Sequence, residues 1–298
     1  MRRFICNLIY LISPRLLAKY YYWRKTPGKR RWLDFRNPQD LNEKINWLKF
    51  YSDTSEWEIY ADKYKVRDYV RSKGLERILP ALYGVWDNAD KIDFDSLPDS
   101  FIFKTNHGCD TNIIVKDKTQ IDIVKVRKDL NRMLKKKYGK ESVELHYKGI
   151  RPMIIAEQLL TDTASFSSSI VDYKIWCFNG KPFSVLVCSD RSGHKMCLGD
   201  YDLEWNYRPE NLVFSSQYLK SNCEIPKPHN FDRMLEFASI LSEKLPQARI
   251  DFYNIDGNIY FGEMTMTSRG GYMNYYTREY LEEMGQMVDL GLAKPKRK

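Results

Sequence analysis

The sequence lacks the features that mark several common classes of protein. Its six cysteines contain no Cys-x-x-Cys pair and no histidine is spaced as a partner ligand, which excludes a structural zinc site. It has no internal repeat and no low-complexity linker, so we expect continuous folded structure. An apolar run near the N-terminus, residues 4–12, falls far short of the roughly 20 residues needed to cross a bilayer.

The same apolar run is not followed by a small-x-small cleavage site, so we expect no signal peptide. In a chain of 298 residues without an export signal, an even number of cysteines favours reduced thiols over a disulfide framework. The expected location is therefore the cytoplasm, and peripheral contact with the inner face of a bacterial membrane stays open as an alternative.

Positive charge is confined to the two ends of the chain. Residues 1–50 contain 12 Lys and Arg against 3 Asp and Glu, which equals the whole surplus of +9. The last five residues add four more positive charges, so that residues 51–293 carry a net charge of −4. No recognised nucleic-acid-binding motif accompanies the basic ends, so nucleic acid is not an expected partner.

The basic N-terminal segment also contains apolar and aromatic residues. Phe4, Leu8 and Ile12 recur at helical spacing, and basic residues and the aromatic run 20–23 surround them. Such a helix suits the surface of a membrane, and it suits equally well an amphipathic helix packed on the protein's own body. We expect a helical segment over residues 1–60, followed by one large domain over residues 61–298.

The pattern of the remaining chain predicts an α+β protein. Helical periodicity covers residues 39–75, and further helices are expected near 121–138 and 231–245. Strands are expected at 101–104, 112–115 and 153–157, and hairpins at 172–188 and 249–263. These elements suggest a small lobe over about residues 100–160 and a large lobe over about 165–290.

The second hairpin gives the clearest chemical signal. A three-residue turn would put Arg249 opposite Glu263, with Asp251 diagonal to Glu263 on the same face, whereas a two-residue turn would separate the two carboxylates. Two carboxylates on neighbouring strands suit Mg²⁺, which takes oxygen ligands and completes its shell with water and phosphates. The alternative is an ordinary cross-strand contact between Arg249 and Glu263 at the surface.

Three other places combine a charged residue with an apolar strand. Lys104 ends the strand 101–104 and leads into a loop around Gly108, where an amine can reach phosphate. Asp172 and Lys174 share one face of a strand and would suit ribose and phosphate, although local sequence alone favours an exposed ion pair. Glu157 ends another strand, where a carboxylate could bind the edge of an adenine.

The order of these segments resembles the ATP-grasp superfamily of carboxylate–amine ligases. The likeness is carried by NPQDLNEKINWLKF, DKYKVRDYV, FKTNHGCDTNIIVKDK, DYKIWCFNGKPF and RIDFYNIDGNIYFGEMT, between about residues 37 and 270. They look most similar to the TupA-like branch, named for a teichuronopeptide biosynthesis protein and found in bacterial surface-polysaccharide loci. The resemblance implies two α+β lobes that hold ATP between antiparallel sheets.

The resemblance also implies roles for the candidate residues. The groups that would bind ATP are Lys63, Lys104 and Gly108 for the phosphates, Glu157 and the backbone near Leu160 for adenine, and Asp172 for ribose. The groups that would act on the reacting atoms are Arg249, Lys174 and Arg191, the last from a basic segment that is more typical of a solvated edge.

The implied metal site consists of Asp251, Glu263 and Thr265, which would hold one or two Mg²⁺ ions. Thr265 stands where many ATP-grasp enzymes have an asparagine, so the family pattern leaves the second ion open. The loop after Gly108 is also poor in glycine, because Cys109 and Asp110 follow.

The implied reaction is ADP-forming ligation through an acyl phosphate, which an amine attacks to give an amide. For this branch, the carboxylate would be a uronic acid of a cell-surface glycan or its lipid-linked precursor, and the amine an amino acid. Either an anionic glycan or an anionic membrane would be attracted to the basic N-terminus.

Two other functions stay open. A glycosyltransferase of polysaccharide biosynthesis would need a DxD-like pair, and Asp93 and Asp95 have that spacing within what looks like a surface turn. A membrane-docked scaffold with a decayed nucleotide site is the alternative without catalysis, suggested by Thr265 and by the glycine-poor loop.

Overall fold

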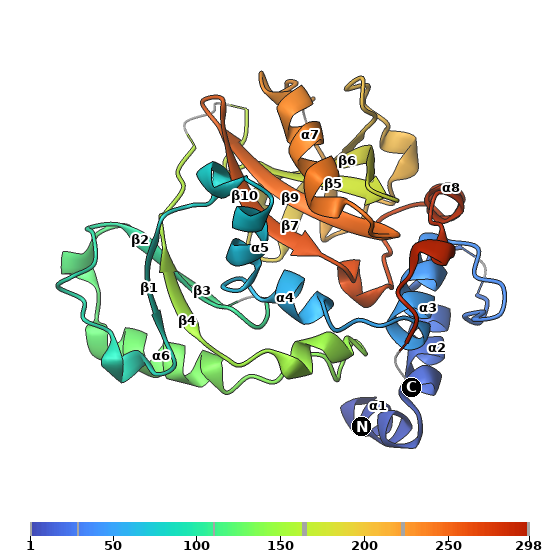
Figure 1. Cartoon of the computed structure of the whole chain (residues 1–298), viewed down its shortest axis with the longest axis horizontal. Helices are drawn as coiled ribbons and strands as arrows, with labels where there is room; N and C mark the ends of the chain where they lie inside the picture. Colours follow the sequence, from blue (N-terminus) through green and yellow to red (C-terminus); the bar gives the residue numbers. More distant parts are fainter. Residues whose placement is uncertain (1, 29, 110, 163–165, 222–223, 297–298) are drawn as a thin grey trace. The chain divides into compact units, whose positions relative to one another are not determined.

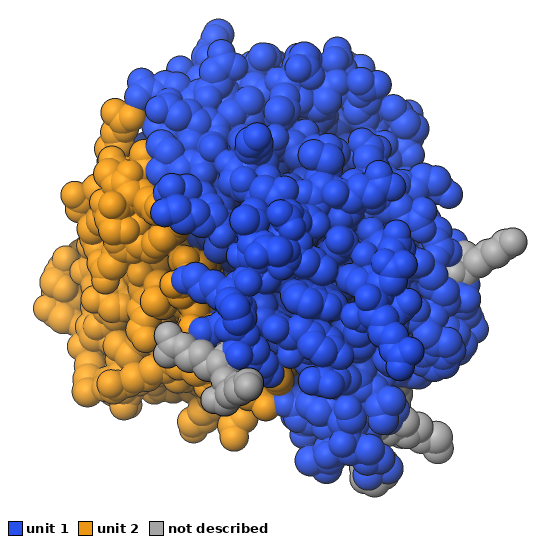
Figure 2. All heavy atoms as spheres, turned by 45° about the vertical axis from the view of Figure 1, so that its right-hand side comes forward, with its two compact units in different colours: residues 1–54, 140–144, 162–298 blue, residues 55–139, 145–161 orange. Residues whose placement is uncertain are grey.

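The computed structural model describes residues 2–28, 30–109, 111–162, 166–221 and 224–296 (Figure 1). The chain divides into two compact units, coloured separately in Figure 2. The larger unit comprises residues 1–54, 140–144 and 162–298, and the smaller comprises 55–139 and 145–161. Each unit is built on one sheet with antiparallel pairing, which confirms the predicted α+β class.

The smaller unit contains a four-stranded antiparallel sheet in the order β1-β4-β2-β3. The strands are β1 (Leu82–Trp86), β2 (Phe101–Thr105), β3 (Asn112–Val115) and β4 (Ile154–Glu157). Phe101 and Phe103 alternate with half-buried residues along β2 and pack with Leu130 of α6 (Ile123–Leu134) in one core. Two short helices, α4 (Trp57–Ala61) and α5 (Val66–Ser72), precede the sheet.

The larger unit contains a six-stranded sheet in the order β10-β9-β5-β6-β7-β8. Its strands are β5 (Asp172–Phe178), β6 (Lys181–Ser192), β7 (Lys195–Tyr201), β8 (Tyr218–Lys220), β9 (Gln247–Ile255) and β10 (Asn258–Thr265). All neighbours are antiparallel except β7 and β8, which are parallel. The first predicted hairpin is confirmed, because Asn179 and Gly180 form its turn with φ angles of 53° and 77°.

Helices pack on both faces of this sheet. On one face, Trp176 and Phe178 of β5 share a core with residues of α3 (Leu41–Tyr51) and α8 (Arg278–Gln286). On the other face lies α7 (Phe231–Ser242), whose Ser239 donates a hydrogen bond to the carbonyl oxygen of Gly180. The central strand β5 is therefore covered on both faces as well as on both edges.

The chain begins with two helices, α1 (Arg2–Ile12) and α2 (Pro14–Lys25), both in the larger unit. Pro14 sits at the first helical position of α2, and Ser13 accepts a hydrogen bond from the backbone nitrogen of Leu16 as its N-cap. The buried residues of α2 belong to a core that also contains Phe50 and Tyr272. Among the residues that the structure describes, no helix is long and apolar enough to cross a membrane.

Candidate functional site

One face of β5 changes from apolar to charged along the strand. Phe178 and Trp176 lie in the core, and the next two residues on the same face, Lys174 and Asp172, are charged and yet only 8% and 6% exposed. The local preference for an exposed ion pair at these two residues is therefore wrong. The reason lies in the position of β5, which is paired with β9 on one edge and with β6 on the other.

The pairing of β5 with β9 extends this charged face across the sheet. Lys174 lies opposite Asp251, and Trp176 lies opposite Arg249. Residues directly opposite each other on antiparallel strands project to the same face. Arg249 and Asp251 therefore join Lys174 and Asp172 on one side of the sheet.

The hairpin of β9 and β10 brings Glu263 to the same place by an unexpected route. Its turn has two residues, Asp256 and Gly257, with φ angles of 50° and 79°. A regular ladder from this turn would put Glu263 and Asp251 on opposite faces. The pairing shifts by one residue between Phe261 and Glu263, so that Glu263 lies opposite Asp251. The expectation that a two-residue turn separates the carboxylates is therefore wrong.

The residue inserted at this β-bulge is Gly262. A Cβ atom at this position would lie 3.0 Å from the carbonyl oxygen of Asp251, which is closer than an ordinary contact. Beyond the bulge, Thr265 lies opposite Arg249. Glycine thus allows the backbone of β10 to approach β9 closely at the point where the carboxylates meet.

Arg249 connects the two carboxylates. Its Nε and Nη2 donate to the two oxygens of Asp251 at 2.7 and 2.8 Å, and Nη2 also donates to Oε1 of Glu263 at 3.1 Å. The same nitrogen donates to the Thr265 hydroxyl at 3.1 Å, and Nη1 donates to the hydroxyl of Ser268. Both carboxylates therefore lie within hydrogen-bond distance of a single nitrogen atom. Ser268 is a contributor that no sequence pattern indicated.

Lys174 and Arg191 complete the arrangement. The Lys174 amine donates to Asp251 and lies 2.9 Å from Oδ2 of Asp172. Arg191, near the end of β6, donates to the same oxygen of Asp172. We name these six residues the charged cluster: Asp172, Lys174, Arg191, Arg249, Asp251 and Glu263. Its three cations balance its three carboxylates.

Burial and charge act in opposite directions on the pKa values of the charged cluster. Burial by itself would lower the pKa of Lys174, but the carboxylates of Asp172 and Asp251 outweigh it and raise that pKa above its ordinary value. Burial raises the pKa of the Asp251 carboxyl, while Arg249 and Lys174 oppose the rise. Lys174 therefore carries its charge throughout the neutral pH range.

The loop after β2 in the smaller unit contains the predicted phosphate-binding residues. The side chain of Asn106 donates to Oδ1 of Asp62 at 2.9 Å and accepts from the backbone nitrogen of Met153 at 2.7 Å, which fixes the start of the loop. The amine of Lys63 donates to the carbonyl oxygen of Gly108. Lys63 and Gly108 are thus brought together, whereas Asp110 lies outside the described residues.

Gly108 also packs tightly. A Cβ atom there would lie 2.2 Å from the ring of Tyr138, whose hydroxyl donates to the carbonyl oxygen of Cys109 at 2.8 Å. The neighbouring His107 makes a hydrogen bond of 3.0 Å between Nε2 and the carbonyl oxygen of Lys136. Close packing therefore explains the glycine in this loop.

Lys104 and Glu157, for which the resemblance implies separate roles, form an ion pair in the smaller unit. Lys104 Nζ lies 2.9 Å from Oε2 of Glu157, and Arg67 Nη1 lies 2.9 Å from Oε1 of the same carboxylate. Arg67 also donates to the carbonyl oxygen of Pro80 at 2.7 Å and is 4% exposed. No local pattern indicated a role for Arg67, because 90 residues separate it from Glu157. Leu160, three residues beyond β4, is half-buried.

The oxygen donors of the charged cluster are of the type that a magnesium ion takes. Asp251 and Glu263 are hard oxygen ligands, and both reach the position of one Arg249 nitrogen. The Thr265 hydroxyl donates to Glu263 at 3.0 Å. Within the described parts of the chain, no three His, Cys, Asp or Glu side chains are grouped to hold a metal, so this pair would rely on phosphate and water for its other ligands.

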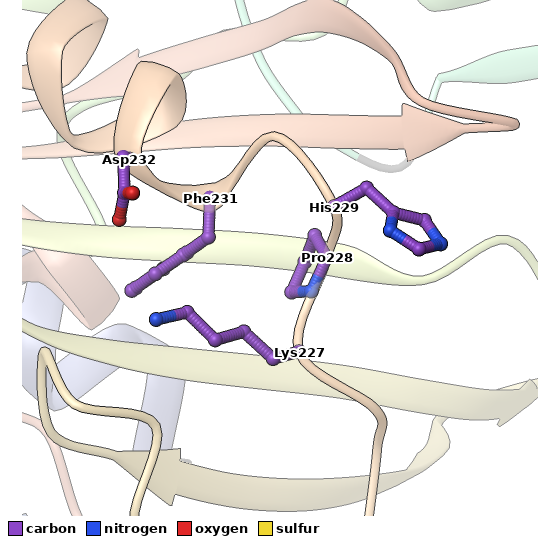
Figure 3. A pocket seen from close by; sticks show the side chains of 5 residues that line it. All are labelled: Lys227, Pro228, His229, Phe231 and Asp232. Carbon is purple, nitrogen blue, oxygen red and sulfur yellow. The ribbon is translucent and has the colours of Figure 1, made fainter.

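Two other features lie apart from these residues. Asp93 and Asp95 form an exposed turn, in which the Asp95 nitrogen donates to the Asp93 side chain at 3.1 Å. A shallow hollow before α7 is lined by Lys227, Pro228, His229, Phe231 and Asp232 (Figure 3). None of the residues predicted to bind ATP or metal lines this hollow.

A family model described as TupA-like ATPgrasp matches residues 43–289. No curated protein matches the chain. The matched range contains both sheets, the charged cluster, and the Lys63 and Lys104 sites.

Solved structures to which the chain is similar include two kinds of ligase. D-alanine–D-alanine ligase from Bacillus anthracis complexed with ATP has 15% identity and a TM-score of 0.41, covering 76% of this chain and 62% of that one. L-amino acid ligase from Bacillus licheniformis has 12% identity and a TM-score of 0.49, covering 82% of this chain and 52% of that one. The chain thus spans less than two thirds of the length of either ligase.

Proposed function

Because the chain belongs to the TupA-like ATP-grasp family, we propose that it is an ATP-dependent carboxylate–amine ligase that releases ADP. Membership confirms the resemblance found in the sequence and the ATP-grasp fold that it implied. The observation that carries the proposal is the charged cluster, in which two buried cations, the more exposed Arg191 and two potential metal ligands lie together on the sheet of the larger unit.

In the proposal, the cations of the charged cluster exchange carboxylate partners for phosphate oxygens. Arg249 and Lys174 are held beside Asp251, so both charges are close to the proposed phosphate position before a substrate arrives. Arg191 is more exposed than either and is best able to turn toward a phosphate or an acidic substrate. Phosphoryl transfer depends mainly on positioning and on charge stabilisation, which is what such fixed cations supply.

Residues of the smaller unit are assigned to the remainder of the nucleotide. Lys63 and Lys104 would bind phosphate oxygens, and Glu157 with the backbone near Leu160 would bind adenine. The ion pair between Lys104 and Glu157 supports a linked role, since a phosphate that attracts Lys104 also frees one carboxylate oxygen of Glu157. Arg67 would hold the other oxygen and keep the carboxylate oriented.

Asp251 and Glu263 would hold Mg²⁺, with Arg249 turned from the place between them toward the phosphate. The bound ion would neutralise phosphate charge and orient the β- and γ-phosphates. Thr265 would orient Glu263 through its hydrogen bond. One ion fits two carboxylates of this kind, and a second ion would need further ligands from the substrates.

The proposed reaction has two steps. A carboxylate oxygen of the acceptor bonds to the γ-phosphorus as the bond to the β–γ bridging oxygen breaks, which releases ADP and leaves an acyl phosphate. The nitrogen of an amine then bonds to the acyl carbon, inorganic phosphate leaves, and the nitrogen loses a proton. Arg249 and Arg191 would stabilise the charge of the transferred group in both steps.

The proposed substrates follow the family branch. We assign a uronic acid of a cell-surface polysaccharide, or its lipid-linked precursor, as the carboxylate and an amino acid as the amine, with the reaction in the cytoplasm. The surplus of nine positive charges in residues 1–50 supports an anionic acceptor.

The experiment is a screen for ADP release with Mg·ATP, a panel of uronic acids and the amino acids, read by mass spectrometry. We expect ADP only when both a carboxylate and an amine are present, together with a product lighter than the two substrates by one water. The Asp251→Asn variant should lose turnover, and Lys195→Met, in an exposed residue outside the charged cluster, should keep it. Binding of a sugar nucleotide in place of ATP, with glycosyl transfer, would overturn the proposal.

A further inference from the structure

The two N-terminal helices have different surroundings. The inward residues of α2, Leu17, Ala18, Tyr21 and Tyr22, are buried in the larger unit. On α1, the residues that face this core are Cys6, Ile9 and Tyr10. The protein's own core thus covers the inward side of α2 and the side of α1 that Cys6, Ile9 and Tyr10 form.

The other side of α1 presents large apolar side chains to solvent. Leu8, Leu11 and Ile12 are 51%, 74% and 69% exposed, and Leu16 at the start of α2 is 50% exposed. Spacings of three and four residues put Leu8, Leu11 and Ile12 on one helical face. We name these four residues the apolar outer face. Grouped exposure of this kind marks an interaction surface rather than scattered surface residues.

Aromatic rings and cations lie next to the apolar outer face. Arg15, one residue before Leu16, stacks over Tyr51 at 4.8 Å from the ring centroid, and Lys19 lies 5.9 Å from the ring of Phe35. Further along, Trp23 stacks on Trp32 with centroids 5.6 Å apart, and Trp32 is 60% exposed. Arg30 lies over Trp23 at 4.6 Å. Exposed Trp and Tyr with neighbouring Arg and Lys are typical of the interface between lipid and water.

The basic C-terminal segment meets the same region. The Lys296 amine donates to the carbonyl oxygen of Phe50 at 3.4 Å, and Pro295 forms a β-bridge with Ser52. Phe50 and Ser52 flank Tyr51, over which Arg15 stacks. Basic residues from near both ends of the sequence, Arg15 and Lys296, therefore meet at the end of α3, although residues 51–293 between them carry a net charge of −4.

We propose that the apolar outer face and its basic, aromatic surroundings dock the protein on an anionic lipid bilayer. The aliphatic side chains would enter the headgroup region, Trp23 and Trp32 would lie at its boundary, and Arg15, Lys19, Arg30 and Lys296 would contact acidic headgroups. An anionic bilayer offers both an apolar layer for the aliphatic side chains and acidic headgroups for the cations. The surface is independent of the charged cluster, so docking needs neither ATP nor an acceptor.

The experiment is sedimentation of the full chain with vesicles of phosphatidylcholine alone or mixed with phosphatidylglycerol, without nucleotide. We expect binding to the anionic vesicles only, and its loss at about 0.5 M NaCl, where charges are screened beyond about 4 Å. The double variant Leu11→Ser with Ile12→Ser should bind about tenfold more weakly or worse, because two insertion sites are lost. Arg15→Glu should also weaken binding.

The matched control is Val124→Ser, which alters an equally exposed apolar residue on α6, 78% exposed, in the smaller unit. It should bind vesicles like the wild type. Because the altered residues are exposed, circular dichroism should show unchanged folding in every variant. Brominated lipid should quench tryptophan fluorescence and unbrominated lipid should not, which would report contact of Trp23 or Trp32 with the bilayer. Equal binding by wild type and double variant, no vesicle binding, or binding to nucleic acid alone would overturn the proposal.

Discussion

Replacing Lys174 by methionine would remove the cation that two buried carboxylates share. The Lys174 amine contacts both Asp172 and Asp251, which are 6% and 1% exposed. Methionine keeps most of the aliphatic volume, so the change isolates the charge. The wild-type charged cluster is neutral, and the variant would leave it with one uncompensated negative charge.

The expected cost follows from the partners that remain. Removing one member of a buried ion pair costs about 3 to 5 kcal/mol, and we expect the lower end, about 3 kcal/mol, because Asp172 keeps Arg191 and Asp251 keeps Arg249. The raised pKa of Lys174 fixes the pH dependence. Its contribution to stability is complete below the unfolded value of 10.5 and is lost only as the pH rises through the higher folded pKa. The difference between variant and wild type should therefore be constant between about pH 6 and 9.

The assay is urea unfolding followed by tryptophan fluorescence, because Trp176 lies two residues from Lys174 in the same strand. A double-mutant cycle with Asp172→Asn should show a coupling of about 1 to 3 kcal/mol, since the second change restores the charge balance. Lys195→Met, at the exposed start of β7, is the control and should change stability by less than about 0.5 kcal/mol. A Lys174→Met protein as stable as wild type, or a cycle with no coupling, would refute the account of the charged cluster.

Two further changes test other parts of the structure. Asp200 is fully buried, and burial raises its pKa to about 7. The free energy of unfolding therefore falls as the pH rises from 3.8 toward 7, because the folded state must then give up the proton of Asp200. The Asp200→Asn variant should lack about 3 kcal/mol of this fall between about pH 5 and 8, as measured by urea unfolding at each pH. An unchanged pH profile would contradict the burial of an ionisable Asp200. The Gly108→Ala variant should lose about 1 to 3 kcal/mol of stability, because the new Cβ atom would meet the Tyr138 ring. Adding Tyr138→Ser should restore the lost stability. If it does not, this contact is not the cause of the loss.

Local patterns were enough to predict much of the fold. The Asn-Gly turn of the first hairpin was readable because both residues adopt positive φ without strain, and the alternation along residues 101–104 marked a half-covered strand. Strands β1, β7 and β8 were missed. Strands β1 and β8 pair with partners that are distant in the sequence, whereas β7 pairs with β6 across a turn at Gly193 and His194, and this turn signal was overlooked.

The candidate site was only partly readable, and the missing parts all depend on long-range packing. The sequence of the second hairpin suggested a carboxylate pair, but the shift at Gly262 that unites Asp251 with Glu263 depends on how the two strands pair. The burial of Lys174 and Asp172 depends on the strands and helices around β5. Arg67 reaches Glu157 from α5, and nothing near either residue indicates this contact.

The most direct test of the account is calorimetric titration of the full chain with Mg·ATP. Wild type should bind, and Glu263→Gln, which changes a side chain that is 43% exposed and so should leave the fold intact, should weaken binding about tenfold or more through the loss of a charged ligand. Without Mg²⁺, the two proteins should bind ATP with similar affinity, because Glu263 then has no ion to hold. A wild-type protein that does not bind Mg·ATP, or a variant that binds it equally well, would contradict the assignment of the charged cluster to the nucleotide.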